Sequence, residues 1–339
     1  MSYLYRVYGL VLKSQTAIQG LSLISPEDEF LSNNDPISIF VGERPNWLDA
    51  TLQLPVSLIY TSSAAGAHAD ATLKLSQLGN QFFRFSYSDG TQFVIDSATK
   101  NIWGTCTPPL TQEDLVTYLV GPVLGFALRR RGILALHASI FCSGNQAFAL
   151  CGGAGAGKST TAAALALRGI PIQCEDIAAL RERDDVCWSS SGYPRVNVWP
   201  ESPLDVLRTP QALPKITPNW EKQFLPLDGT AFEKQERQLA AVYLLVSRRD
   251  EINAPRIEEI SSREAVLSLV QNTYMNYLLT AKQREMEFDA ITRLVSRTVV
   301  RRLVPHSDPA KLALMCDLLE TDSAKVARIP TSSIASERP

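Results

Sequence analysis

The fold of this chain is decided by Cys151-Gly152-Gly153-Ala154-Gly155-Ala156-Gly157-Lys158-Ser159-Thr160, which contains the pattern G-x-x-x-x-G-K-S/T of a phosphate-binding loop. Glycines have no side chains, so successive backbone N–H groups can turn inward around a phosphate. We expect Lys158 to place its charge at the β and γ phosphates, and the Ser159 hydroxyl to bind Mg²⁺. The stretch therefore predicts that the protein binds a nucleoside triphosphate.

The segments on either side of the loop have the character that the motif requires. Residues 146–151 form a short apolar run typical of a strand, and residues 160–168 form an alanine- and leucine-rich run typical of a helix, which ends at Gly169. A helix that begins near Lys158 directs the positive end of its dipole at the bound phosphates. Strand, loop and helix are the order in which this motif occurs.

Two acids follow the next predicted strand. Residues 170–174 form a strand-like run that ends at Glu175 and Asp176, one helix and one strand after the loop. A strand that returns beside the first would bring both carboxylates to the mouth of the loop. One acid could then hold the metal that bridges the phosphates, and the other could accept the proton of an attacking hydroxyl. Taken alone, the pair could equally be the polar end of a strand.

The residues before the loop predict a helix followed by a β-hairpin. Apolar residues recur at helical spacing over residues 115–128, and Gly132 ends this helix. An apolar run over residues 133–142 then predicts a strand that pairs with residues 146–151 across a short turn. His137 lies on this strand, where an isolated histidine is more commonly a core residue than a site residue.

Composition divides the chain into two regions and a tail. Residues 1–108 contain short β-branched and aromatic runs separated by turn sequences, and they predict a β-rich domain. Pro108-Pro109 marks a break, after which residues 109–325 form the predicted nucleotide-binding domain. Residues 326–339 contain few large apolar side chains and predict a disordered tail.

The overall composition is that of a globular protein without a strong charge. Of 339 residues 45% are hydrophobic, and the net charge of −2 favours neither nucleic acid nor an anionic membrane as a partner. The first residues lack the order of a secretion signal, and no apolar stretch is long enough to cross a bilayer. The six cysteines have no metal-binding spacing. We therefore expect a cytoplasmic protein with no nucleic-acid or membrane partner.

Several motifs together resemble the HPr kinase/phosphorylase family. The resemblance lies in the glycine-rich loop and in three further motifs, Leu136-His137-Ala138-Ser139, Arg168-Gly169 and Glu175-Asp176. It is closer still to the HPr-kinase-like serine kinases, which share a β-rich first half and the stretches Arg130-Arg131-Gly132 and Gly192–Pro200. The resemblance is strong over residues 110–320 and weak over the first hundred.

This resemblance implies a fold and a set of roles. The fold would be α/β, with a P-loop kinase core of the HPr kinase/carboxykinase type, a mixed sheet with flanking helices, and an N-terminal β-rich α+β domain. ATP and Mg²⁺ would be the cofactors, with Lys158 and Ser159 at the phosphates and the metal. Asp176 would be the metal-binding acid and Glu175 the general base. His137 would lie in the wall of the site.

Two departures from the family narrow the expected activity. Glu175 replaces the first of two aspartates, and the glycine-rich signature of the bifunctional enzymes has no clear counterpart. We therefore expect a monofunctional serine kinase that acts on a peptide or small protein, such as a ribosomally made precursor peptide, and that can form homo-oligomers. Two alternatives stay open, a kinase of a small metabolite and an ATP-sensing regulator. Arg195 could clamp phosphate in the transition state or pair with a surface acid.

Overall fold

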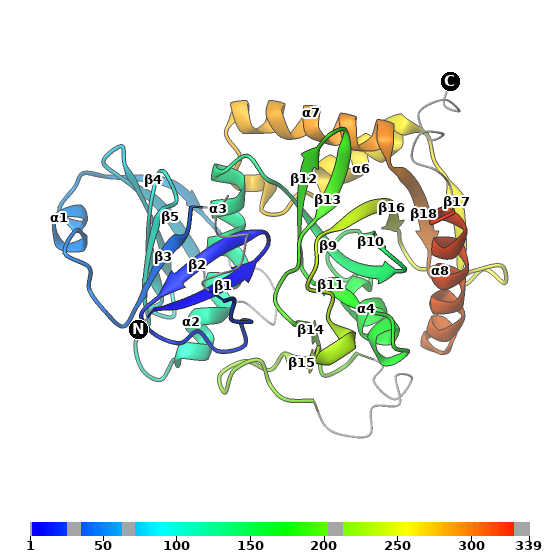
Figure 1. Cartoon of the computed structure of the whole chain (residues 1–339), viewed down its shortest axis with the longest axis horizontal. Coiled ribbons are helices and arrows are strands. Elements are labelled where there is room, and N and C mark those ends of the chain that lie inside the picture. The colour runs from blue at the N-terminus through cyan, green and yellow to red at the C-terminus, as the bar shows by residue number, and fades with distance from the viewer. Residues whose placement is uncertain (1, 26–34, 63–71, 203–212, 329–339) are drawn as a thin grey trace. The chain divides into compact units, whose positions relative to one another are not determined.

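The computed structural model describes residues 2–25, 35–62, 72–202 and 213–328. The chain forms two compact units (Figure 1). Unit 1 contains Met1–Arg131 and Ile216–Trp220, and unit 2 contains Gly132–Lys215 and Glu221–Pro339. Both combine helices with a sheet that holds parallel and antiparallel strand pairs, so the predicted α/β class is confirmed. The narrower assignment to the HPr kinase/carboxykinase type stays a prediction.

Unit 1 is built on an eight-stranded sheet with the order β1-β2-β3-β8-β7-β6-β5-β4. The pairs β2–β3 and β3–β8 are parallel, and the other pairs are antiparallel. The strands are β1 (Tyr3–Val7), β2 (Leu10–Ser14), β3 (Ile37–Val41), β4 (Val56–Thr61), β5 (Leu73–Leu78), β6 (Phe82–Tyr87), β7 (Gln92–Asp96) and β8 (Asn101–Thr105).

The helices of unit 1 explain where the unit ends. They are α1 (Leu48–Leu52), α2 (Gln112–Tyr118), the π-helical turn η2 (Leu119–Val123) and α3 (Leu124–Arg130). Phe126 of α3 packs edge-on against Phe83 and Phe85 of β6, with ring centroids 5.1 and 5.3 Å apart. Because this aromatic packing holds the helices on the sheet of unit 1, unit 1 extends past Pro108-Pro109, where the sequence places the boundary, to Arg131.

The predicted helix over residues 115–128 is interrupted. Gly121 has non-helical backbone angles, and Pro122 lacks the N–H that would continue the ladder. The kink separates α2 from α3 and leaves both apolar faces buried.

Unit 2 is built on a second sheet with the order β10-β9-β12-β13-β16-β18-β17. β11 pairs with β9, and β16 also pairs with β10, so the strands from β10 to β16 close into a ring. The strands are β9 (Leu134–Ser143), β10 (Gln146–Cys151), β11 (Ile172–Cys174), β12 (Ile177–Arg183), β13 (Val186–Ser189), β16 (Arg237–Leu245), β17 (Arg256–Glu259) and β18 (Val299–Val304). A separate hairpin consists of β14 (Arg195–Val198) and β15 (Gln223–Pro226).

Helices cover both faces of this sheet. On one face α4 (Lys158–Leu167) and α8 (Leu312–Val326) pack on a core that includes the stacked rings of Phe141 and Phe148. On the other face lie α6 (Ser262–Gln271) and α7 (Ala281–Arg297) (Figure 1). Three 3-10 turns, η3 (Gly229–Ala231), η4 (Asn276–Leu278) and η5 (Pro309–Lys311), connect these elements. Because both faces of the sheet are covered, the ends of β10 and β11 are held in place, and the loop and the acids Glu175 and Asp176 follow these ends.

Two sequence predictions concern membranes and the C-terminal tail. Within the described ranges, no helix combines the length and apolar character needed to cross a membrane. Of the tail predicted over residues 326–339, Val326 ends α8. Residues 329–339 lie outside the described residues.

Candidate functional site

The glycine-rich loop connects β10 to α4. Gly157, the residue before the helix, has φ = 106°, a left-handed conformation that a residue with a side chain rarely adopts. A Cβ atom on Gly152 would lie 2.7 Å from the carbonyl oxygen of Leu245 on the neighbouring strand β16. The glycines therefore permit the tight turn and the close passage of two backbones, and the N-terminus of α4 opens onto the loop.

Lys158 is held at the loop by two carbonyl groups. Its Nζ donates hydrogen bonds to the carbonyl oxygens of Gly152 and Gly153, at 2.7 and 3.1 Å. Burial lowers the pKa of this ammonium, although the nearby Asp176 and Glu175 act in the opposite direction. An ammonium has three N–H donors. The third can donate to a ligand oxygen at the loop.

The acid pair lies in the gap between two short strands that share one neighbour. Cys174 of β11 pairs with Ile140 of β9, and Ile177 of β12 pairs with His137 of the same strand. Both β10 and β11 are antiparallel to β9, so they run in the same direction and end at the same edge of the sheet. The sequence predicted that the strand of the acids would return beside β10, whereas β9 lies between them. The acids nevertheless reach the loop.

Glu175 is buried and accepts hydrogen bonds on both carboxylate oxygens. The Ser159 hydroxyl donates to Oε1 at 2.6 Å, and Nδ2 of Asn197 donates to Oε2 at 2.9 Å. Burial and the neighbouring carboxylate of Asp176 raise the pKa of Glu175, and this outweighs the opposite effects of Lys222, of the Ser159 hydroxyl and of the Asn197 backbone. The loop and the acid pair are thus joined by a direct hydrogen bond.

Asp176 is more exposed than Glu175 and pairs with His137. Nε2 of His137 lies 3.2 Å from Oδ1 of Asp176. Burial alone would raise the pKa of Asp176, but the hydrogen bond from His137 and the nearby positive charges of Lys222 and Lys158 lower it below its usual value. The backbone N–H of His137 donates to the carbonyl oxygen of Asn272, which fixes this part of β9. Two neighbouring carboxylates therefore have pKa values shifted in opposite directions.

The structure adds two residues that the sequence did not identify, Asn197 and Lys222. Asn197 lies on β14, opposite Phe224 of β15, and reaches Glu175 from this hairpin. Lys222 directly precedes β15, and its Nζ lies 5.3 Å from the centre of the Trp199 ring. Asn197 lies in the stretch 192–200 that resembles the HPr-kinase-like serine kinases, so this resemblance could have indicated it as a site residue. Lys222 belongs to no motif, and only the fold brings its charge near the acids.

A cavity of about 220 Å³ lies beside the loop at Ala156 and Gly157. Arg248 lies in its wall together with residues of the loop, of α4 and of the segment before α8. His306 also lines the cavity, and its Nδ1 accepts a hydrogen bond from the backbone N–H of Asp308 at 2.8 Å. Further lining residues come from the loop, from α4, from the segment before α8 and from α8 itself: Ala156, Thr160, Thr161, Ser307, Lys311 and Met315.

The predicted site residues are therefore found close together, with Arg195 in a different setting. The structure brings the loop residues, Lys158, Ser159, Glu175, Asp176 and His137 into one region. The guanidinium of Arg195 instead lies against the aromatic rings of Tyr193 and Phe224, at 4.6 and 5.4 Å from their centres. Cation–π contacts of this kind stabilise the hairpin.

The site offers oxygen donors that suit Mg²⁺. Ser159, Glu175 and Asp176 supply hydroxyl and carboxylate oxygens, the hard ligands that this cation prefers. In the described part of the chain, no group of three or more His, Cys, Asp and Glu side chains could hold a metal ion. Mg²⁺ in kinases is usually held by one or two carboxylates plus phosphate oxygens and water, and the residues present fit that pattern.

Comparison with known proteins gives a weak structural similarity and no match in sequence. No protein-family model matches the chain, and no curated protein matches its sequence. Among solved structures, the chain is similar to the Hpr(Ser) kinase/phosphatase from Coxiella burnetii, with a TM-score of 0.32 and 14% sequence identity. The match covers 57% of this chain and 98% of that one. Similarity at this level establishes neither the fold nor the function of this chain.

Proposed function

We propose that this protein is an ATP- and Mg²⁺-dependent kinase that phosphorylates a serine hydroxyl of a peptide or small protein. The observation that carries the proposal is the hydrogen bond of 2.6 Å from Ser159, at the start of α4, to Glu175. It joins a phosphate-binding loop to a pair of carboxylates in a single site. A loop alone would support binding of a nucleotide, whereas a loop with two acids supports transfer of its terminal phosphate.

The loop and its flanking cavity fit a nucleoside triphosphate. The N-terminus of α4 and Lys158 supply positive charge for the phosphates. The cavity beside Ala156 and Gly157 offers space next to the phosphates for the nucleoside, with Arg248 and His306 as polar groups that can bind it. ATP is the proposed nucleotide on the strength of the family resemblance.

The two acids are proposed to have different tasks. Mg²⁺ bound with the nucleotide would neutralise charge on the phosphates. The Ser159 hydroxyl keeps lone pairs for a cation while its hydrogen is donated to Glu175, so this contact supports Glu175 as the acid at the metal end. Asp176 is more exposed than Glu175 and is held by His137, and this position suits it to accept the proton of the serine hydroxyl.

This division reverses the roles that the family resemblance implies, in which Glu175 is the base and Asp176 binds the metal. The raised pKa of Glu175 favours that original assignment, because a base works best when its pKa is close to the working pH. The two assignments predict that different variants lose the binding of Mg²⁺ with ATP. Asp176→Asn should keep binding of Mg²⁺ with ATP if Asp176 is the base, and Glu175→Gln should keep it if Glu175 is the base.

The experiment that tests the proposal is acceptor-dependent release of ADP. Purified protein with ATP and Mg²⁺ is mixed with serine-containing peptides and with the same peptides carrying alanine in place of serine. Release that requires both the serine and an intact acid pair supports a serine kinase. Release with a small hydroxylated metabolite instead favours the metabolite kinase. Binding of ATP without release in any mixture favours the ATP-sensing regulator.

A further inference from the structure

The β14–β15 hairpin presents one of its faces to the acid pair. Val196 and Val198 of β14 are buried in the core beside α4. Side chains alternate along a strand, so Asn197 lies on the opposite face, and Trp199 continues that face. From there Asn197 donates to Oε2 of Glu175 at 2.9 Å. The hairpin therefore forms a wall of the site beside the acids.

Lys222 lies on the same face of the hairpin, where the ring of Trp199 supports it. β15 pairs with β14 in a register that places Phe224 opposite Asn197. Lys222 is two residues before Phe224 and therefore continues the same face. Its Nζ lies 5.3 Å from the centre of the Trp199 ring. A cation–π contact of this kind holds the flexible stem of a lysine and keeps its ammonium in place.

The ammonium of Lys222 acts on three charged groups of the site. Burial has the largest effect on the pKa values of the two acids and of Lys158, and the charge of Lys222 acts on each of them toward a lower pKa. Charge effects fall off with distance and are screened by water and salt, so the ammonium lies near all three groups. The space between Lys158 and the acid pair is where the proposed function places the terminal phosphate.

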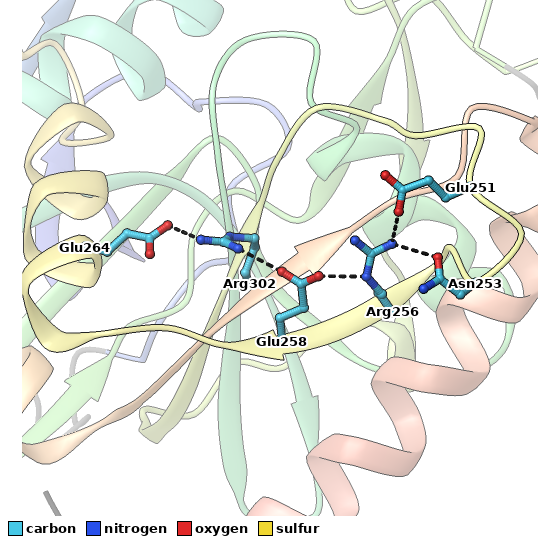
Figure 2. A network of polar contacts seen from close by, with 6 residues as sticks. All are labelled: Glu251, Asn253, Arg256, Glu258, Glu264 and Arg302. Atoms are coloured by element: carbon cyan, nitrogen blue, oxygen red, sulfur yellow. Dashed lines mark hydrogen bonds and ion pairs between the residues drawn. The ribbon is translucent and has the colours of Figure 1, made fainter.

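Lys222 has no carboxylate partner within the described residues, unlike several arginines of unit 2. Arg256 and Arg302 are both paired, since Glu258 accepts from them at 2.7 and 2.8 Å (Figure 2). Among the residues that the structure describes, Lys222 forms no such ion pair, and its contact is with Trp199. The two acids have other partners, a serine, an asparagine and a histidine. A lysine placed in this way can bind a phosphate as a point charge.

We propose that Lys222 is a second cation for the terminal phosphate of the nucleotide, which it binds from the hairpin while Lys158 binds it from the loop. This inference rests on the proposed kinase function and extends it. During transfer, the bond from the γ phosphorus to the oxygen of the leaving ADP breaks, a bond to the serine oxygen forms, and the serine proton passes to a carboxylate of the acid pair. Lys222 keeps its proton throughout, and its N–H groups donate to the phosphoryl oxygens and stabilise their negative charge.

Two variants separate this role from a structural one. Lys222→Met removes the charge and keeps an aliphatic stem against Trp199, whereas Lys222→Arg keeps the charge. Titration calorimetry measures the affinity for ADP and for a non-hydrolysable ATP analogue, each with Mg²⁺. Lys222→Met should weaken the analogue about tenfold and ADP less than about twofold, because only the analogue has a γ phosphate. Lys222→Arg should keep the preference for the analogue over ADP.

Lys215→Met is the matched control. Lys215 also precedes β15 in the chain, but its ammonium pairs with Glu221 at 3.0 Å. This variant should change both affinities and the transfer rate by less than about twofold. With a serine peptide as acceptor, Lys222→Met should lower kcat about a hundredfold. Each variant should keep the thermal unfolding profile of the unmodified protein.

The binding measurements decide the role of Lys222 separately from the kinase function. A Lys222→Met variant that weakens ADP and the analogue equally, or weakens neither, overturns the inference, and so does an equal effect of Lys215→Met. Phosphate transfer by the unmodified protein would still support the kinase function in each of these cases. Absence of transfer would refute the kinase function, but a selective loss of the analogue in Lys222→Met would still support Lys222 as a ligand of the γ phosphate. A protein that binds neither nucleotide overturns both.

Discussion

Replacement of Lys158 by methionine should weaken nucleotide binding without unfolding the protein. The change keeps the aliphatic stem and removes the ammonium that donates to Gly152 and Gly153. A hydrogen bond from a charged donor to a phosphate contributes about 1.5–3 kcal/mol, so the dissociation constant for ATP should rise about 10- to 150-fold. The folded protein loses the two hydrogen bonds, which lowers its stability, but it no longer has to bury an ammonium, which raises it. The lowered pKa of Lys158 shows that burial disfavours the charged form. The net change in stability should stay within about 1 kcal/mol.

Titration calorimetry with a non-hydrolysable ATP analogue and Mg²⁺ measures the binding, and chemical denaturation measures the stability. Lys282→Met, an exposed lysine on α7, is the control and should bind as the unmodified protein does. An unchanged dissociation constant in a folded Lys158→Met variant would refute the assignment of this loop to the phosphates. Equal weakening in Lys282→Met would show that the effect is not local.

Three further predictions concern the loop and the acid Glu175. Gly152→Ala should lower the free energy of unfolding by about 1–3 kcal/mol, because the new Cβ would lie 2.7 Å from the carbonyl oxygen of Leu245. Gly153→Ala is the control and should leave the free energy of unfolding nearly unchanged in denaturant melts, because no atom lies within 4 Å of its Cβ position. Because the pKa of Glu175 is raised in the folded protein, the stability that this group contributes is present below its ordinary pKa and is lost as the pH rises through the folded-state pKa. Relative to the unmodified protein, Glu175→Gln should therefore be more stable at pH 8 than at pH 4. A difference in unfolding free energy that does not change with pH would contradict this. Asn197→Ala removes the donor to Oε2 of Glu175, so the rate of phosphate transfer should fall about tenfold while the affinity for ATP changes little. An equal loss of rate and affinity would instead indicate that Asn197 has a structural role.

The fold could be predicted where the sequence signal is local. The loop motif, the strand before it and the helix after it required only neighbouring residues, and β10 and α4 lie where they were expected. Residues 3–12 have the composition of a single strand, but Tyr8 and Gly9 have positive φ values of 56° and 67° and turn the chain into a hairpin. A tyrosine rarely adopts a positive φ, so Gly9 alone is a weak indication of a turn at this point.

The site was predicted in part, for a reason that follows from the topology. Glu175 and Asp176 were placed near the loop because helix and strand lengths limit how far the chain can travel. That β9 separates their strand from β10 depends on pairing between distant segments, which one sequence does not reveal. Lys222 reaches the acids through the β14–β15 hairpin, 46 residues after Asp176 in the chain, so no spacing rule could have found it.

We propose that the loop and the acid pair together transfer a phosphate to a serine. This transfer can be measured by intact-mass spectrometry of serine-containing peptides encoded beside this gene, after incubation with the protein, ATP and Mg²⁺. The proposal predicts a peptide that gains one phosphate on a serine, and no gain with Asp176→Asn or Glu175→Gln. ATP binding without added mass on any peptide, or a gain that persists in both variants, would contradict it.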